Sequence, residues 1–197
     1  MTPRSFGRNS KLIVLAAAVV TIAGVGCGTF TGVPASLPTI SDSGIVYAIN
    51  GAPPGAPTAL YVFGGSLLAA DATFTFDVAF DIDSTGAVVV IPQSAVASGL
   101  APTHTVALQL VPGLFDNIAS APKSGYRADT ATVLPITRTM AIQSQDTNAC
   151  GTSITGSTVY GKVTVVAVDP IARTINVRFT TDPNCGFFSF ASGIPTS

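Results

Sequence analysis

Alternation of apolar and polar residues along much of the chain predicts short β-strands. The clearest case is residues 73–82, TFTFDVAFDI. A period of two turns the bulky apolar side chains toward a core and the acidic ones, Asp77 and Asp81, toward solvent. The sequence DSTG at 83–86 then predicts a turn into residues 87–91, so that the two segments form a β-hairpin.

Similar segments, separated by glycine and proline, predict further strands. We expect them at residues 44–49, 59–63, 105–111 and 131–143, the last with an edge or a bulge at Pro135. In the first of these, one face is expected to carry Ile45, Tyr47 and Ile49.

A long hairpin turning at residues 169–170 is expected to close the domain. Its inward-facing residues are predicted to be Val159, Val163, Val165, Ala167, Ile175, Val177 and Phe179. Eight or nine short strands with little helix signal predict an all-β fold. We expect an antiparallel β-sandwich, with a partly closed β-barrel as the alternative.

One apolar run, residues 12–23, lacks this alternation. Arg4, Arg8 and Lys11 precede it, and small residues follow it. As a helix the run rises about 18 Å, short of the roughly 30 Å hydrocarbon core of a bilayer. This layout is typical of a secretory signal, so residues 1–26 are predicted to be a signal peptide.

The signal ends in Val25, Gly26 and Cys27, with Gly24 before them. This ending resembles the lipobox of bacterial lipoprotein precursors, although that family usually has leucine at the position of Gly24. The resemblance implies cleavage before Cys27 and attachment of fatty acyl groups such as palmitate to this cysteine. Cleavage nearby by the ordinary signal peptidase, which would give a secreted protein, is the alternative.

The resemblance also implies a domain organisation and a location. Residues 27–40, rich in turn formers, are expected to be a lipid-anchored tether, and residues 41–197 a single β-sandwich domain. The protein is then expected in the bacterial cell envelope, at the outer membrane or its periplasmic face. Its expected partners are the membrane, through the lipid, and envelope proteins or glycans.

The remaining cysteines, Cys150 and Cys185, form a natural pair if Cys27 carries lipid. They lie 20 and 15 residues from the predicted turn at residue 170, so the hairpin brings them close together. A bridge closing a loop of this length stabilises a domain by about 4 kcal/mol. We therefore predict a Cys150–Cys185 disulfide, formed in an oxidising compartment.

Removal of residues 1–26 changes the charge balance. Nine basic residues become six while all ten acidic residues remain, so the formal net charge falls from −1 to −4. No basic patch of the kind that nucleic acid requires is left.

The sequence offers few groups for catalysis or metal binding. His104 is the only histidine, and no G-x-S-x-G motif occurs. Residues 81–86 begin like a calcium loop, but Pro92 stands where the bidentate acid is needed. We expect a non-catalytic protein without a metal or cofactor, and a hydrogen-bonded or solvent-exposed structural role for His104.

The long stretch 113–130 has no usable period, and long loops are often functional. Its candidate ligand-binding residues are Asp116, Lys123, Tyr126 and Arg127, which combine charge with an aromatic ring suited to an acidic or sugar-like group. Two functions remain open. The first is a cell-envelope lipoprotein with a structural or protein-interaction role, and the alternative is a small-ligand or carbohydrate-binding module that uses this loop.

Overall fold

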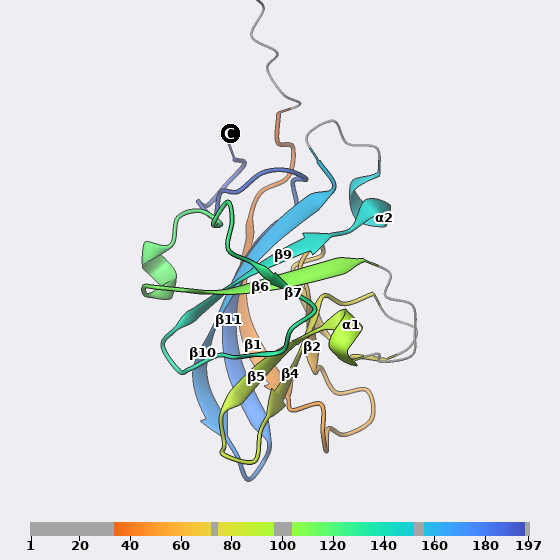
Figure 1. The fold of residues 1–197 in the computed structure, drawn as a ribbon, viewed down its shortest axis with the longest axis vertical. Coiled ribbons are helices and arrows are strands. Elements are labelled where there is room, and N and C mark those ends of the chain that lie inside the picture. The colour runs from red at the N-terminus through yellow and green to blue at the C-terminus, as the bar shows by residue number, and fades with distance from the viewer. Residues whose placement is uncertain (1–33, 72–74, 97–103, 152–155, 196–197) are drawn as a thin grey trace, which may run out of the picture. The chain divides into compact units, whose positions relative to one another are not determined.

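Two antiparallel β-sheets packed against each other form the folded domain (Figure 1). The structure is a computed structural model that describes residues 34–71, 75–96, 104–151 and 156–195. The described strands form two separate sheets and do not close into one barrel, so the predicted all-β sandwich is confirmed. The expected signal peptide and Cys27 lie outside the described residues.

The larger sheet has six strands. Their order across the sheet is β1 (Ile40–Tyr47), β11 (Thr174–Asp182), β10 (Thr158–Asp169), β9 (Thr139–Gln145), β6 (Thr105–Val111) and β7 (Arg127–Ala128). The β10–β11 hairpin at its centre is the predicted closing hairpin, and β1 joins it antiparallel to β11.

The smaller sheet has five strands. Their order is β3 (Ser66–Leu68), β2 (Ala59–Tyr61), β4 (Val78–Ile82), β5 (Val88–Pro92) and β8 (Thr132–Val133). Three single turns of helix complete the described elements: α1 (Gln93–Val96), the 3-10 turn η1 (Phe115–Asn117) and α2 (Thr147–Cys150). Within the described ranges, no helix has the length and apolar character needed to cross a bilayer.

The main core lies between the two sheets. Its largest fully buried side chains include Phe80 and Leu60 from the five-stranded sheet and Phe179 and Ile142 from the six-stranded sheet. Fully burying a side chain of this kind stabilises the fold by about 1.5–3 kcal/mol. The β4–β5 and β10–β11 hairpins therefore each turn an apolar face toward this core, as the alternation predicted.

The side-chain orientation that the alternation predicts for Ala167 is wrong. In β1, Val46 is buried, as is Ala48 directly after the strand, whereas Ile45 on the other face is 56% exposed. The pairing of Val46 with Ile175 sets this orientation, because residues directly opposite each other share one face of a sheet. In β10, Ala167 is exposed because a β-bulge after Val165 shifts the register.

Two predicted strands also differ in extent. In the segment expected at 73–82, residues 73 and 74 lie outside the described residues, and the strand in the remainder begins at Val78. Phe76 packs in a small outer cluster against Ala79. The segment expected at 131–143 contains β8 and β9, which belong to different sheets. Pro135 lies between them, where the absence of a backbone N–H favours an interruption of the ladder.

A second buried cluster covers the outer face of the six-stranded sheet. Tyr160 of β10 packs there against Phe188 and Phe190 from the C-terminal segment, with ring centroids of Tyr160 and Phe188 4.7 Å apart. The long connection between β6 and β7 adds Ile118 to this cluster, and a bridge between Ser120 and Ser189 joins the two segments. The stretch expected to be irregular is thus folded onto the sheet.

Candidate functional site

The predicted disulfide is present. Cys150, at the end of α2, is bonded to Cys185, which follows β11, with their Cα atoms 5.7 Å apart. Both side chains pack against the main core. The bridge therefore closes the end of the sandwich at which β10 begins and β11 ends.

The last residues of the expected tether are bound to this same end. Asn184 holds them: its Oδ1 accepts hydrogen bonds from the backbone N–H groups of Ser36 and Leu37, at 2.9 and 3.0 Å. Its Nδ2 donates to the carbonyl of Leu37, and Thr39 bonds to the backbone of Gly193. The chain that precedes β1 is thus hydrogen-bonded to the C-terminal segment.

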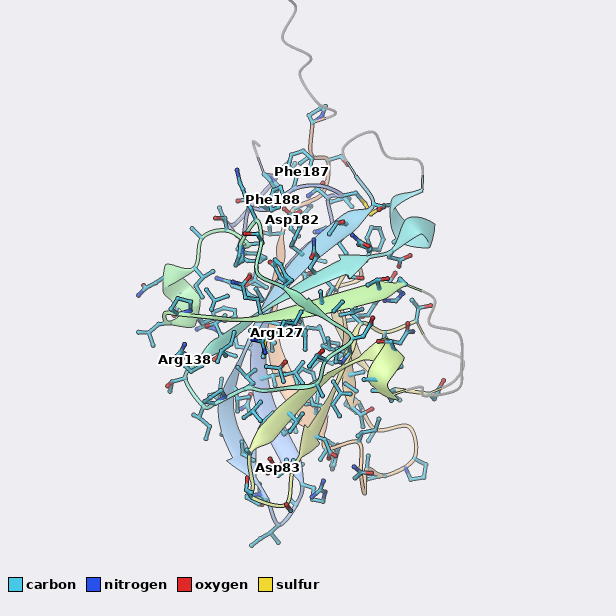
Figure 2. The ribbon with its side chains drawn as sticks, in the orientation of Figure 1. Asp83, Arg127, Arg138, Asp182, Phe187 and Phe188 are labelled. Carbon is cyan, nitrogen blue, oxygen red and sulfur yellow. A yellow bond between two sulfur atoms is a disulfide. The ribbon has the colours of Figure 1, made fainter. Side chains whose placement is uncertain are left out.

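Asp182, at the end of β11, supports Asn184. Asp182 Oδ1 accepts hydrogen bonds from the backbone and side chain of Asn184, while its Oδ2 is buried without a hydrogen-bond partner in the described part of the chain. Burial raises the pKa of Asp182, and the two bonds from Asn184 only partly oppose that shift. Figure 2 shows Asp182 near Phe187 and Phe188, at the opposite end of the domain from Asp83.

A buried ion pair joins Asp77 and His104. The prediction that Asp77 faces solvent is wrong, because it is only 1% exposed. Its Oδ2 accepts from the backbone N–H of Val62 at 2.6 Å, and its Oδ1 accepts from His104 Nε2 at 3.0 Å. Of the two environments expected for the sole histidine, the hydrogen-bonded one is observed and the solvent-exposed one is not.

Burial of the His104 ring opposes protonation and lowers its pKa. The hydrogen bond to Asp77 and the negative charges of Asp77 and Asp146 outweigh this effect, so the pKa of His104 is raised above 6.5. Pairing with Asp77 thus favours proton binding by the His104 ring in this closed interior position.

An open depression lies over the outer face of the six-stranded sheet, beside η1. Its volume is about 530 Å³, within the range of ligand pockets. Its walls come from β1, η1, β10, β11 and the C-terminal segment, and its lining includes Ser41, Asp42, Ser43, Phe115, Asp116, Lys162, Arg178, Thr180, Phe190 and Ser192.

Lys162 provides one of two cationic groups in this depression. Although it points outward from β10, it is only 5% exposed. Its Nζ donates to the carbonyl oxygens of Phe115 and Ile118, both at 2.8 Å, and lies 4.3 Å from the centre of the Phe115 ring. The loop that carries η1 therefore covers the lysine.

Arg178 of β11 provides the second cation. Its Cζ lies 4.2 Å from the centre of the same Phe115 ring, and its guanidinium is paired with Asp116. The Asp116 side chain is 79% exposed and that of Arg178 39% exposed, so this ion pair is at the surface. Two cations thus share one aromatic side chain.

The four candidate ligand-binding residues of the loop are not brought together. Asp116 lines the depression, whereas Lys123 and Arg127 are exposed and line neither pocket described here. Tyr126 packs against Tyr160, and burial, followed by the proximity of Tyr160, raises its pKa. It borders a smaller pocket of about 240 Å³ with Thr105 and Gln143.

Sequence reasoning did not identify Phe115, Lys162 and Arg178 as site residues. Lys162 and Arg178 occupy outward positions of strands, where charged side chains are ordinarily solvated. The only available signal was the interruption of two apolar strands by a single cation each, as in VYGKVTV and INVRF.

The calcium-like sequence forms the predicted hairpin turn. Asp83 Oδ1 accepts hydrogen bonds from the hydroxyl and backbone N–H of Thr85 and from the N–H of Ala87. The bond from the Thr85 hydroxyl is the main cause of a lowered pKa of Asp83. Among the described residues, no group of three or more His, Cys, Asp or Glu side chains is arranged to hold a metal ion.

Comparison with protein-family models, curated proteins and solved structures found no match for this chain.

Proposed function

We propose that this protein is a non-catalytic lipoprotein of the bacterial cell envelope, anchored through acyl groups on Cys27. Its β-sandwich would then serve a structural or protein-interaction role. The observation that carries the proposal is the binding of residues 36–39 to Asn184 and the C-terminal segment, because it limits the length of chain between the cysteine and the domain.

Eight residues, 28–35, separate Cys27 from Ser36. Fully extended, such a segment spans about 30 Å. A lipid on Cys27 would therefore keep the disulfide-bonded end of the domain close to the membrane. The opposite end, with Asp83 and the β10–β11 turn, would face other envelope components.

The surface chemistry agrees with this role. A net charge of −4 and the absence of a basic patch after residue 26 favour protein or glycan partners over nucleic acid. The only histidine is engaged with Asp77 inside the domain, which favours a non-catalytic function.

Mass spectrometry of the N-terminus of the protein from its native envelope tests the anchor. We expect a diacylglyceryl-modified Cys27, and we expect Cys27→Ala to move the protein from the membrane fraction to the soluble fraction. Cys150→Ala with Cys185→Ala is a matched control, which removes cysteines but should leave any folded protein in the membrane fraction. An unmodified N-terminus at another residue would contradict the proposal.

The start of the 113–130 loop supports the alternative function, a small-ligand or carbohydrate-binding module. Asp116 and Phe115 of this loop line the depression on the six-stranded sheet. Exposed Lys123 and Arg127 lie outside it, so a ligand site would use the start of the loop together with β10 and β11.

A further inference from the structure

Lys162 is a buried cation that has no ion pair with a carboxylate in the described part of the chain. The three ion pairs of the described residues involve Asp77, Asp81 and Asp116, and none includes Lys162. Its hydrogen-bond acceptors in this part of the chain are two neutral carbonyl oxygens. Buried charges are rarely left without an opposite charge, because transfer from water costs several kcal/mol. The site is therefore electrostatically incomplete.

The environment of Lys162 has a measurable consequence. Burial lowers the pKa of Lys162, and the positive charge of Arg178 lowers it further, while Asp116 only partly opposes the shift. An anion bound beside the ammonium would raise the pKa of Lys162 again, because a nearby opposite charge favours the charged form of the side chain.

Two N–H groups of residues that line the depression have no acceptor among the described residues. An ammonium carries three N–H groups, and the two carbonyls use two of those on Lys162. The Nε of Arg178 is buried and has no hydrogen-bond partner among the described residues. A group with several negatively charged oxygens can accept hydrogen bonds from an ammonium and a guanidinium together.

We propose that this depression binds a small hydroxylated ligand through an oxyanion, a carboxylate or a phosphate group, with Lys162 and Arg178 as its opposing charges. Ser41, Ser43 and Ser192 also line the depression, and their hydroxyl groups would suit hydroxyls on the ligand. This site is independent of the lipid anchor, and it names the ligand class for the small-ligand alternative above, on which it rests.

Asp116 is the internal competitor of such a ligand. Its exposed carboxylate is paired with Arg178, so the ligand's oxyanion displaces it. A surface ion pair contributes little, about 0.2–1 kcal/mol. We expect Asp116→Asn to strengthen anion binding by about 1.4- to fivefold, which is that energy range expressed as a ratio of affinities.

Calorimetric titration of the processed protein tests the site, with inorganic phosphate, glucuronate and glucose as probes at pH 7. Saturable binding of glucuronate assigns a carboxylated sugar, and binding of phosphate alone assigns a phosphate group. Either result supports the proposal. Binding of neither anion, or equal binding of neutral glucose, overturns it.

Variants locate the binding. We expect Arg178→Gln and Lys162→Met each to weaken binding of the anion that binds the wild type at least tenfold. Lys123→Ala with Arg127→Ala is the matched control, because it removes two exposed cations outside the depression. Circular dichroism melting verifies folding, and Arg178→Gln keeps the test valid if Lys162→Met is unfolded. An equal loss in the control, or no loss in Arg178→Gln, overturns the proposal whether or not Cys27 carries lipid.

Discussion

Two regions of the domain bury a basic side chain, and they treat it differently. His104 is enclosed with Asp77, whose second oxygen is bonded to the backbone of Val62. Lys162 lies under the loop that carries η1, where two carbonyl oxygens and the ring of Phe115 surround it, and among the described residues it forms no ion pair with a carboxylate. His104 has an acidic partner within the fold, whereas Lys162 borders an open depression.

The difference separates a structural role from a binding role. Two buried groups that are paired with each other help to stabilise the folded state. Removing one of them leaves the other without its partner inside the domain. A buried cation without a counter-charge is a site at which an external anion gains more than it would in water. We therefore assign the Asp77–His104 pair to the stability of the fold and Lys162 to the binding of an anionic ligand.

Removal of Asp77 should have the largest effect. Asp77→Ala leaves His104 and the N–H of Val62 without their acceptor, and we expect a loss of about 3–5 kcal/mol in the free energy of unfolding. Urea denaturation measures this loss. Asp116→Ala, which removes an exposed carboxylate, is the matched control and should cost less than about 1 kcal/mol. Similar costs for the two variants would contradict the structural role of the pair.

The same pair should make stability depend on pH. Because the pKa of His104 is raised in the folded state, its contribution is complete below the ordinary value near 6.5. The contribution is lost as pH rises through the raised folded-state value. The free energy of unfolding should therefore fall over this range in the wild type and remain flatter in His104→Gln. Histidine NMR gives the pKa without ambiguity, since the chain has one histidine.

Replacement of Lys162 should have the smallest effect on stability. Lys162→Met removes the cost of burying a cation and keeps a long side chain over Phe115, so we expect a change within about 1 kcal/mol. Urea denaturation without added anions measures it. A loss above about 3 kcal/mol would show that Lys162 serves the fold as Asp77 does, which would remove the distinction between the two regions.

The sequence predicted the β-sandwich and the disulfide because both follow from local patterns. Alternation identified β4, β6 and the β10–β11 hairpin, and the position of one turn was enough to bring Cys150 near Cys185. The errors arose where tertiary pairing decides the outcome. The face of β1 that is buried depends on its register against β11, which places Val46 inside, and the bulge after Val165 turns Ala167 outward.

The candidate site was harder to predict for the same reason. Lys162 occupies an outward strand position, and its burial depends on a loop more than 40 residues earlier in the chain. The alternation predicts that Asp77 is exposed, yet its carboxylate is buried and accepts hydrogen bonds from the backbone of Val62, just after β2, and from His104. Among the four candidate loop residues, only Asp116 lines the depression. Its partner there, Arg178, is on a strand far along the chain, so the loop sequence alone did not indicate this position.

The most direct test is an NMR titration of the lysine side chains of the processed protein. Only two lysines follow residue 26, Lys123 and Lys162. We expect addition of glucuronate or phosphate to shift the ε-methylene signals of Lys162 saturably while those of Lys123 stay unchanged. Unchanged Lys162 signals with both anions, or equal shifts of both lysines, would contradict the account of Lys162 as a buried cation that an external anion completes.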